Sequence, residues 1–230
     1  MTKKIIPNHI GFIVDGNRRW ARKHGLPTYE GHLAGYNAIK EIGVAALNAG
    51  VKYVSAYIFS TENWKRSEDE VNKLMGLVLR LLTSDLPLFE KYNVKLNVLG
   101  SRDNLNDKII KAIDNAEAKT ANNTAGTLAI CFNYGGQLEI VDAVKKITQA
   151  GTKIDDITVD LISQNLYAPE IPPVDIVVRT SGEQRISNFM LWRVAYSEMM
   201  FIDKLWPDMK KSDVTNIINE YNKRQRRFGE

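Results

Sequence analysis

The sequence predicts an α/β fold: a single domain with a mostly parallel, six-stranded central sheet flanked by helices. Apolar or β-branched runs of strand length alternate with longer amphipathic segments, an order typical of strands joined by crossover helices. The 230 residues, 44% of them hydrophobic, are enough for a substantial core. No repeat, low-complexity tract or linker divides the chain, so we assign residues 1–230 to one domain.

The first half of the chain predicts three strands and two helices. The strands, rich in apolar and β-branched residues, are expected at 10–14, 51–59 and 94–99. A helix is predicted over 33–49, ended by Gly50. The next begins at Ser67, which has Glu70 three residues later as in a capping box, and continues with apolar residues at helical spacing: Val71, Leu74, Met75, Val78 and Leu82. The polar residues between, 60–66, are predicted as a loop.

The second half of the chain continues the alternation. Residues 105–121 have the pattern of an amphipathic helix, and a strand at 128–132 runs into Asn133-Tyr134-Gly135-Gly136. A helix is expected from about Gln137, followed by a polar stretch. Two further strands are predicted at 174–178 and 199–202, and a basic helix is predicted to close the chain at 216–228.

Composition and cysteine count exclude several classes of protein. The 31 basic and 27 acidic residues give a formal charge of +4, too small by itself to indicate a nucleic-acid-binding protein. Cys131 is the single cysteine, which excludes an intrachain disulfide and a four-thiolate zinc site, and we expect a cytoplasmic protein. The chain has no apolar run long enough for a membrane span, and its N-terminal apolar run is too short for a signal peptide.

Three polar segments follow predicted strands, at 15–20, 60–66 and 179–188. Ligands of open α/β sheets bind beyond the carboxyl ends of the strands. Arginine forks bind phosphate oxygens, glycine and serine let backbone N–H groups approach an anion, and a carboxylate such as Asp15 or Glu198 suits Mg²⁺. The three segments therefore predict one site for a diphosphate and Mg²⁺.

Aromatic residues in or beside these segments add an apolar side to the predicted site, which favours an amphiphilic substrate; they are Trp20, Phe59, Trp64 and Phe189. Each motif also has a structural interpretation: residues 15–17 can form a turn, the arginines a solvated helix face, and His32 a helix cap. The combination of three segments favours function. Phosphate-binding loops, dinucleotide fingerprints, zinc-protease motifs and nucleophile elbows are absent from the sequence.

At these segments the sequence resembles the cis-prenyltransferases, the undecaprenyl diphosphate synthase family. The motifs span His9 to Gly229 and are, in chain order, HIGFIVDGNRRWA, GHLAGY, FSTENWKR, NYGGQLEIVDA, VDIVVRTSGEQRISNFMLWRVAYSEMMFIDKLWPDM and RRFG. The resemblance implies an α/β fold with an apolar tunnel for the prenyl chain. It also implies a Mg²⁺-dependent transferase that condenses isopentenyl diphosphate with an allylic diphosphate to give a (Z)-polyprenyl diphosphate.

The resemblance implies a role for each matching residue. Asp15 and Glu198 would bind Mg²⁺, and Asn63 is commonly assigned a part in proton removal. An amide is a weak base, so the released diphosphate or a water is an alternative. The first segment and His32 would hold the allylic diphosphate, the second would close over the substrates as a mobile loop, and the third would hold isopentenyl diphosphate. The implied substrate-binding residues are Gly16, Asn17, Arg18, Arg19, Trp20, His32, Ser60, Thr61, Glu62, Trp64, Arg66, Arg179, Arg185, Ile186 and Ser187.

Two departures from the family pattern concern substrate and product. Many relatives have Arg where this chain has Thr28, which puts one diphosphate contact in doubt, and Arg18 is a candidate replacement. Ile58 stands where long-chain relatives have Ala. Because packed interiors tolerate little overfilling, a larger side chain in the tunnel would limit chain growth, and we predict a product shorter than undecaprenyl.

Several alternatives and partners follow from the same resemblance. One alternative is a branched, non-elongating condensation of allylic diphosphates, and another is a non-catalytic partner subunit. The resemblance implies a homodimer in which the terminal residues 227–229 reach toward the partner's site. A poorly soluble product also implies transient contact with the membrane surface. No nucleic-acid partner is expected, since the basic tail 223–227 lacks a recognised nucleic-acid-binding signature.

Overall fold

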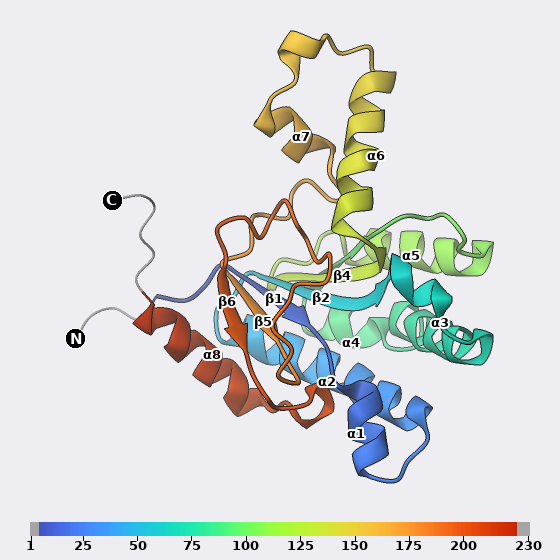
Figure 1. Cartoon of the computed structure of the whole chain (residues 1–230), viewed down its shortest axis with the longest axis vertical. Coiled ribbons are helices and arrows are strands. Elements are labelled where there is room, and N and C mark those ends of the chain that lie inside the picture. The colour runs from blue at the N-terminus through green and yellow to red at the C-terminus, as the bar shows by residue number, and fades with distance from the viewer. Residues whose placement is uncertain (1–4, 225–230) are drawn as a thin grey trace.

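The computed structural model describes residues 5–224 and places six strands in one parallel sheet, in the order β3-β4-β2-β1-β5-β6. Helices connect the strands up to β5, whereas an irregular segment leads from β5 to β6 (Figure 1). The prediction of a single α/β domain with a mostly parallel, six-stranded sheet is confirmed. The strands are β1 (His9–Ile13), β2 (Tyr53–Ser60), β3 (Val94–Leu99), β4 (Gly126–Tyr134), β5 (Ile176–Arg179) and β6 (Glu198–Phe201).

The order of the strands creates a crevice beside β1. The chain goes from β1 to β2 on one side, whereas β5 pairs with β1 on the other. Ile13 at the end of β1 aligns with Tyr57 of β2 and with Arg179 of β5. The segments after these three strands therefore start at the same edge of the sheet, at a point where the strand order reverses, and such points are where α/β proteins bind ligands.

The larger apolar core lies between one face of the sheet and the helices that cover it. Its largest side chain is Trp206, which is buried, packs beside Phe12 of β1 and donates a 2.9 Å hydrogen bond to the carbonyl of Gly35. The helices are α1 (Asn17–Lys23), α2 (Thr28–Asn48), α3 (Glu68–Leu82), α4 (Leu86–Lys91), α5 (Asp107–Thr120), α6 (Gly136–Gln149), α7 (Val159–Asn165) and α8 (Lys211–Lys223), with the 3₁₀ turns η1 (Thr61–Lys65), η2 (Ile154–Asp156) and η3 (Trp206–Asp208).

A second apolar cluster covers the other face of the sheet, where irregular segments around residues 167–194 pack on it. Phe189 and Tyr57 stack there with ring centroids 5.3 Å apart. A buried ion pair joins α6 to the same segments, because Arg193 donates a 2.7 Å hydrogen bond to Glu139. Beyond this pair, α6 and α7 project from the body of the molecule (Figure 1).

The structure corrects several sequence-based expectations, among them the start of the helix predicted over 33–49, which begins at Thr28. Residues 60–66, predicted as a loop, contain η1, and residues 17–23 form the separate helix α1. The helix α4 was not predicted, since six residues are too short for a periodic pattern. The last helix starts at Lys211 rather than 216, because the Asp213 side chain accepts the Lys210 backbone N–H at 2.7 Å and caps it. Its predicted continuation to 228 and the tail motif lie outside the described residues.

Candidate active site

A cavity of about 830 Å³ opens at the carboxyl ends of β1, β2 and β5. It is lined by residues from all three predicted segments, together with α2. The lining residues are Ile13, Val14, Asp15, Gly16, Asn17, Arg18, Arg19, Arg22, His32, Tyr57, Ile58, Phe59, Ser60, Glu62, Asn63, Arg66, Arg179, Ser187 and Asn188. Residues of all three predicted segments therefore line one cavity, as the sequence predicts.

Arg179 and Asp15 form the centre of this cavity. Arg179 is buried at the end of β5 and donates a 2.8 Å hydrogen bond to Oδ2 of Asp15, just beyond β1. Its other terminal nitrogen donates to the Ser187 hydroxyl at 2.8 Å and to the Arg185 carbonyl at 2.5 Å. Burial opposes ionisation of Asp15, but the hydrogen bond and charge of Arg179 outweigh it and lower its pKa. Asp15 is therefore an ionised, partly exposed carboxylate.

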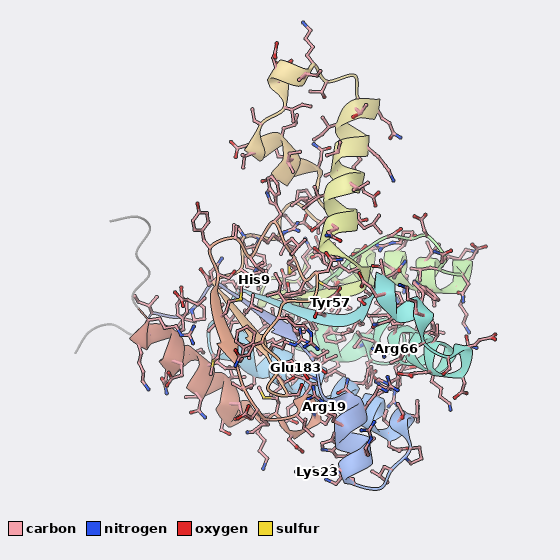
Figure 2. The ribbon with its side chains drawn as sticks, viewed as in Figure 1. His9, Arg19, Lys23, Tyr57, Arg66 and Glu183 are labelled. Carbon is pink, nitrogen blue, oxygen red and sulfur yellow. The ribbon has the colours of Figure 1, made fainter. Side chains whose placement is uncertain are left out.

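Arg19 lies on the other side of Asp15. Its guanidinium is 3.4 Å from the Asp15 carboxylate and 3.2 Å from that of Glu183, and it donates a 3.0 Å hydrogen bond to the Ser181 carbonyl. Figure 2 shows Arg19 and Glu183 close together. Glu183 also pairs with Arg185 at 2.5 Å. This pairing directs Arg185 to Glu183, and Arg185 does not line the cavity.

Asn17 is held where α1 and α2 pack closely. A Cβ added to Gly31 would lie 2.1 Å from the Asn17 carbonyl oxygen, and one added to Gly35 would lie 2.3 Å from Asn17 Oδ1. That oxygen is buried without a hydrogen-bond partner among the described residues. Glycines at these two positions let the helices approach and place the start of α1 on the cavity.

Glu70 on α3 joins three basic residues of the cavity. One of its carboxylate oxygens lies 3.1 Å from His32, 3.0 Å from Arg66 and 4.0 Å from Arg18. Burial lowers the pKa of His32 against the opposing effect of Glu70. Burial works against ionisation of Glu70, yet the His32 hydrogen bond and the Arg66 charge lower its pKa. The sequence presents Glu70 as a helix cap; its spacing of four residues from Arg66 was the available signal for this further role.

The turn η1 covers one side of the cavity and is fixed at both ends. Ser60 and Asn63 form a capping box, in which Asn63 Oδ1 accepts the Ser60 backbone N–H at 3.2 Å. The Trp64 indole donates a 2.8 Å hydrogen bond to Asn133 and packs edge-on against Phe59. Trp64 is therefore an anchor for η1 and, like Thr61, does not line the cavity.

Five residues at the ends of β1 and β2 give the cavity an apolar wall: Ile13, Val14, Tyr57, Ile58 and Phe59. Ile58 is partly buried and packs against the larger core. The cavity thus combines cationic and apolar surfaces, but of the four aromatic residues predicted to form the apolar side, Trp20, Phe59, Trp64 and Phe189, Phe59 alone lines it. A closed tunnel behind Ile58 stays a prediction.

Three other predicted site residues lie away from the cavity. The Trp20 indole donates a 2.7 Å hydrogen bond to Asp208 and packs on His24, 4.2 Å between ring centroids. Ile186 packs against the second apolar cluster. Glu198 accepts a 3.1 Å hydrogen bond from Arg224.

The position of Glu198 separates it from Asp15 within one chain. Glu198 aligns with Ile176, three residues before Arg179, on a strand two places from β1. At about 3.3 Å per residue and about 4.8 Å between strands, Glu198 lies roughly 10 Å along the strands from the level of Arg179 and Ile13, and roughly 10 Å across from β1, while Asp15 lies two residues beyond Ile13. The predicted pairing of Asp15 and Glu198 on one ion therefore does not form within a single chain in this arrangement.

The structure adds two polar residues that the predicted site omits, Arg22 and Asn188. Arg22 follows Arg18 by four residues, so both can face the cavity from one side of α1. That spacing was the sequence signal for Arg22. Asn188 is the last residue of the third segment. Its neighbours come from other parts of the chain, so no local sequence pattern identifies it as a site residue.

Together, the parallel sheet and the arginine-rich, half-apolar cavity define an α/β protein with a cavity whose chemistry suits an amphiphilic anion. Residues 13–229 match the family model described as "Putative undecaprenyl diphosphate synthase". The chain therefore belongs to this family of cis-prenyltransferases and is a prenyl-transferring enzyme, as its resemblance to the family implied.

Sequence relatives and solved structures agree with this assignment. The chain is 44% identical to isoprenyl transferase of Thermotoga maritima over 97% of both chains, and 45% identical to that of Staphylococcus saprophyticus over 97% of this chain and 90% of the relative. It is similar to lavandulyl diphosphate synthase of Lavandula x intermedia in complex with dimethylallyl diphosphate (TM-score 0.94, 32% identity, 99% and 100% covered). It is also similar to a "probable undecaprenyl diphosphate synthase" of Campylobacter jejuni (TM-score 0.83, 30% identity, both fully covered).

Proposed function

We propose that this enzyme condenses isopentenyl diphosphate with an allylic diphosphate in a Mg²⁺-dependent reaction that gives a (Z)-polyprenyl diphosphate. The observation that carries the proposal is one cavity with an apolar wall and a cationic wall. Its cationic residues are Arg18, Arg19, Arg22, Arg66 and Arg179. Such a cavity suits substrates with a diphosphate head and a hydrocarbon tail. The 44–45% identity to isoprenyl transferases supports the same reaction class.

Asp15 is the residue that would hold Mg²⁺. Its carboxylate is ionised, partly exposed and faces the cavity, and oxygen is the ligand that Mg²⁺ prefers. Among residues 5–224 no group of three or more His, Cys, Asp or Glu side chains could hold a metal alone. This donor set fits an ion that takes its remaining ligands from substrate phosphates and water. Bound there, Mg²⁺ would supply positive charge to the departing diphosphate.

The arginines would hold two anions of like charge close together. Breaking the allylic C–O bond moves its electron pair onto the leaving diphosphate, so donors that are already in place stabilise the transition state. Arg18 and Arg19 on α1 would hold the allylic diphosphate, with the N–H groups of Gly16 and Asn17. Arg179 and Ser187 across the cavity would hold isopentenyl diphosphate, and Arg185 would reach it only by leaving Glu183.

The condensed carbon must then lose a proton to form the new double bond. Asn63 lines the cavity, but its Oδ1 accepts the Ser60 backbone N–H at 3.2 Å. An amide oxygen is a weak base, so we propose that Asn63 orients the reacting group while the released diphosphate or a water takes the proton.

A branched condensation of allylic diphosphates is the second candidate. One observation favours it: the structural match with a TM-score of 0.94 is to a lavandulyl diphosphate synthase bound to dimethylallyl diphosphate. Elongation is favoured because the isoprenyl transferases share 44–45% identity with this chain, against 32% for that synthase. A non-catalytic partner subunit is disfavoured, since Asp15, Arg179 and Arg185 are all present.

We also propose a homodimer, supported by apolar side chains exposed on the projecting α6–α7 unit. Val141 and Val144 are 48% and 45% exposed, and Ile154 and Val159 are 85% and 69% exposed. Several apolar side chains exposed on one projecting unit make that unit a candidate interface. If Glu198 binds the same ion as Asp15, a second copy must supply it. Sedimentation of wild type and of Val144→Glu tests the dimer, and a wild-type monomer would contradict it.

We also propose a cytoplasmic location with transient contact at the membrane surface. The contact is expected because a long prenyl diphosphate is poorly soluble in water. No helix within residues 5–224 is long and apolar enough to cross a bilayer. Flotation with anionic vesicles, in the presence and absence of product, tests this contact.

One assay tests the proposed reaction. The protein is incubated with Mg²⁺, labelled isopentenyl diphosphate and, in turn, dimethylallyl, geranyl or farnesyl diphosphate, and product lengths are measured. We expect elongation of at least one primer and loss of turnover in EDTA. No elongation with any primer would contradict the proposal, and product from dimethylallyl diphosphate alone would favour branched condensation.

A further inference from the structure

Asn188 lies where the third polar segment meets both η1 and the start of α6. We infer that Asn188 is a positioning residue that couples η1, which carries Glu62 and Asn63, to the segment that carries Ser187. The kinetic part of this inference rests on the proposed function, whereas the coupling itself is a property of the fold.

Three hydrogen bonds hold Asn188 in place. Its carbonyl oxygen accepts the Gly136 backbone N–H at 2.8 Å, and its side-chain Oδ1 accepts that of Gln137 at 2.9 Å. These bonds cap α6, whose N-cap residue, Gly135, has no side chain to do so. The side-chain Nδ2 donates to Glu62 Oε1 at 3.3 Å.

The partners of Asn188 fix the orientation of its amide. The Gln137 N–H can only donate, and an ionised Glu62 can only accept, so rotating the amide by 180° would lose both bonds. Burial opposes ionisation of Glu62, but hydrogen bonds, including that from Asn188, outweigh it and lower its pKa. Asparagine is thus the residue type that satisfies both neighbours at once.

The backbone around Asn188 shows how closely these elements approach. Ser187 and Asn188 have φ values of 47° and 66°, in the left-handed region that Asn adopts more readily than most residues. A Cβ added to Gly135 would lie 2.9 Å from Asn188 Nδ2 and 2.9 Å from Thr61 Oγ1. The turn before α6, η1 and the third segment therefore meet with no room for another side chain.

This arrangement joins two walls of the cavity. Glu62 precedes Asn63 on one wall, and Ser187, which holds Arg179, precedes Asn188 on the other. The other side-chain anchors near η1, Trp64 to Asn133 and Arg66 to Glu70, connect it to different elements. Loss of the bond between Asn188 and Glu62 would release η1 from the third segment while those anchors remain.

Asn188→Asp separates this coupling from simple helix capping. Asp keeps an acceptor for the Gln137 N–H and is as good an N-cap as Asn, so α6 stays capped. It loses the donor to Glu62 and sets two carboxylates against each other. In the double variant Glu62→Gln/Asn188→Asp, the new amide can donate to the new carboxylate and restores the bond with reversed polarity. Asn122→Asp, in the exposed turn before β4, is the matched control.

Limited trypsin digestion measures how firmly η1 is held, since trypsin cleaves after Lys65, the last residue of η1, and after Arg66, which follows it. We expect Asn188→Asp to accelerate cleavage at these two residues roughly tenfold, the scale of one lost hydrogen bond to a charged group. Glu62→Gln, the double variant and the control should cleave at nearly the wild-type rate. Wild-type cleavage in Asn188→Asp, or equal acceleration at Lys145 and Lys146 of α6 with a lower Tm, would overturn the inference.

Steady-state kinetics with labelled isopentenyl diphosphate complete the test. We expect kcat of Asn188→Asp to fall about tenfold, and the double variant to turn over faster than Asn188→Asp. If kcat of the double variant shows no recovery once the effect of Glu62→Gln alone is taken into account, the coupling is contradicted. If the wild-type enzyme elongates no primer, the proposed function fails, and the digestion experiment still decides whether Asn188 couples the two segments.

Discussion

Arg179 donates a 2.8 Å hydrogen bond to Asp15 although 164 residues separate them in the chain. The pair forms because β1 and β5 are neighbours in register, with Ile13 opposite Arg179. This contact keeps the Asp15 carboxylate ionised while it stays partly exposed. A buried arginine thus prepares Asp15 for a cation and at the same time orients Ser187.

Asp15→Ala should abolish turnover while binding of the substrates is reduced much less. We expect kcat to fall at least about 100-fold, because the carboxylate that would hold Mg²⁺ is lost. Radiolabel incorporation measures turnover and calorimetry measures substrate binding. Asp69→Ala, on the exposed start of α3, is the control. Near-wild-type turnover would remove Asp15 from the metal role.

Ile58→Ala should give longer products than wild type. The change removes three carbon atoms from a partly buried side chain at the cavity wall, which leaves room for additional isoprene units. Chromatography and mass spectrometry of the products measure chain length, with Ile157→Ala on the exposed α6–α7 connection as a control. An unchanged product distribution would show that Ile58 does not limit the chain.

Glu70→Gln should lower the pKa of His32 further and reduce activity. The Glu70 carboxylate opposes the lowering of that pKa by burial, and it holds Arg66 and contacts Arg18. We expect activity to fall up to about tenfold, since the hydrogen bond from Arg66 loses the charge of its acceptor. NMR titration of the His32 ring measures the pKa, and Glu68→Gln on the exposed face of α3 is the control. An unchanged His32 titration would contradict this role.

His9 should make the protein less stable in mild acid. Burial lowers its pKa from 6.5 to about 4, and its ring bonds the Pro172 carbonyl at 2.9 Å and the Ser55 hydroxyl at 2.7 Å. Between these pKa values the unfolded chain binds the proton more readily, so the stabilisation present above pH 6.5 is lost as the pH falls toward 4. The loss from this residue should reach about 2 kcal/mol by pH 5.

Urea unfolding at pH 7 and pH 5 measures this dependence. The variant His9→Gln cannot take up the proton, so its free energy of unfolding should change less between the two pH values, whatever its stability at pH 7. Exposed His24→Gln is the control and should keep the wild-type difference. An equal pH dependence in wild type and His9→Gln would show that His9 is not responsible.

Helix starts encoded by neighbouring residues were the most predictable part of the fold. The capping box at Ser67 is one example, as the Glu70 backbone N–H lies 3.4 Å from the Ser67 hydroxyl. The side chain of Glu70 was not predictable in the same way, because His32 and Arg18 reach it from other helices. Local spacing determines a cap, whereas the partners of a side chain depend on which helices pack together.

The same distinction between local pattern and tertiary packing applies to the candidate site. Asp15, Arg19 and Arg179 could be assigned from their places after strands and from the family motifs, and they do meet. Arg185 and Trp20 could not be placed correctly from the sequence, since Glu183 and Asp208 hold them away from the cavity. Glu198 is held by Arg224 at a different level of the sheet.

The sequence by itself determined the fold class, the edge of the sheet where the site lies and the chemistry of its walls, because periodicity, caps and residue type are local properties. Only the tertiary structure decided the strand order, the contact between Arg179 and Asp15, the role of Glu70 and the bridging position of Asn188. These features depend on the register and packing of segments far apart in the chain, and no local pattern encodes which distant side chains come within hydrogen-bond distance.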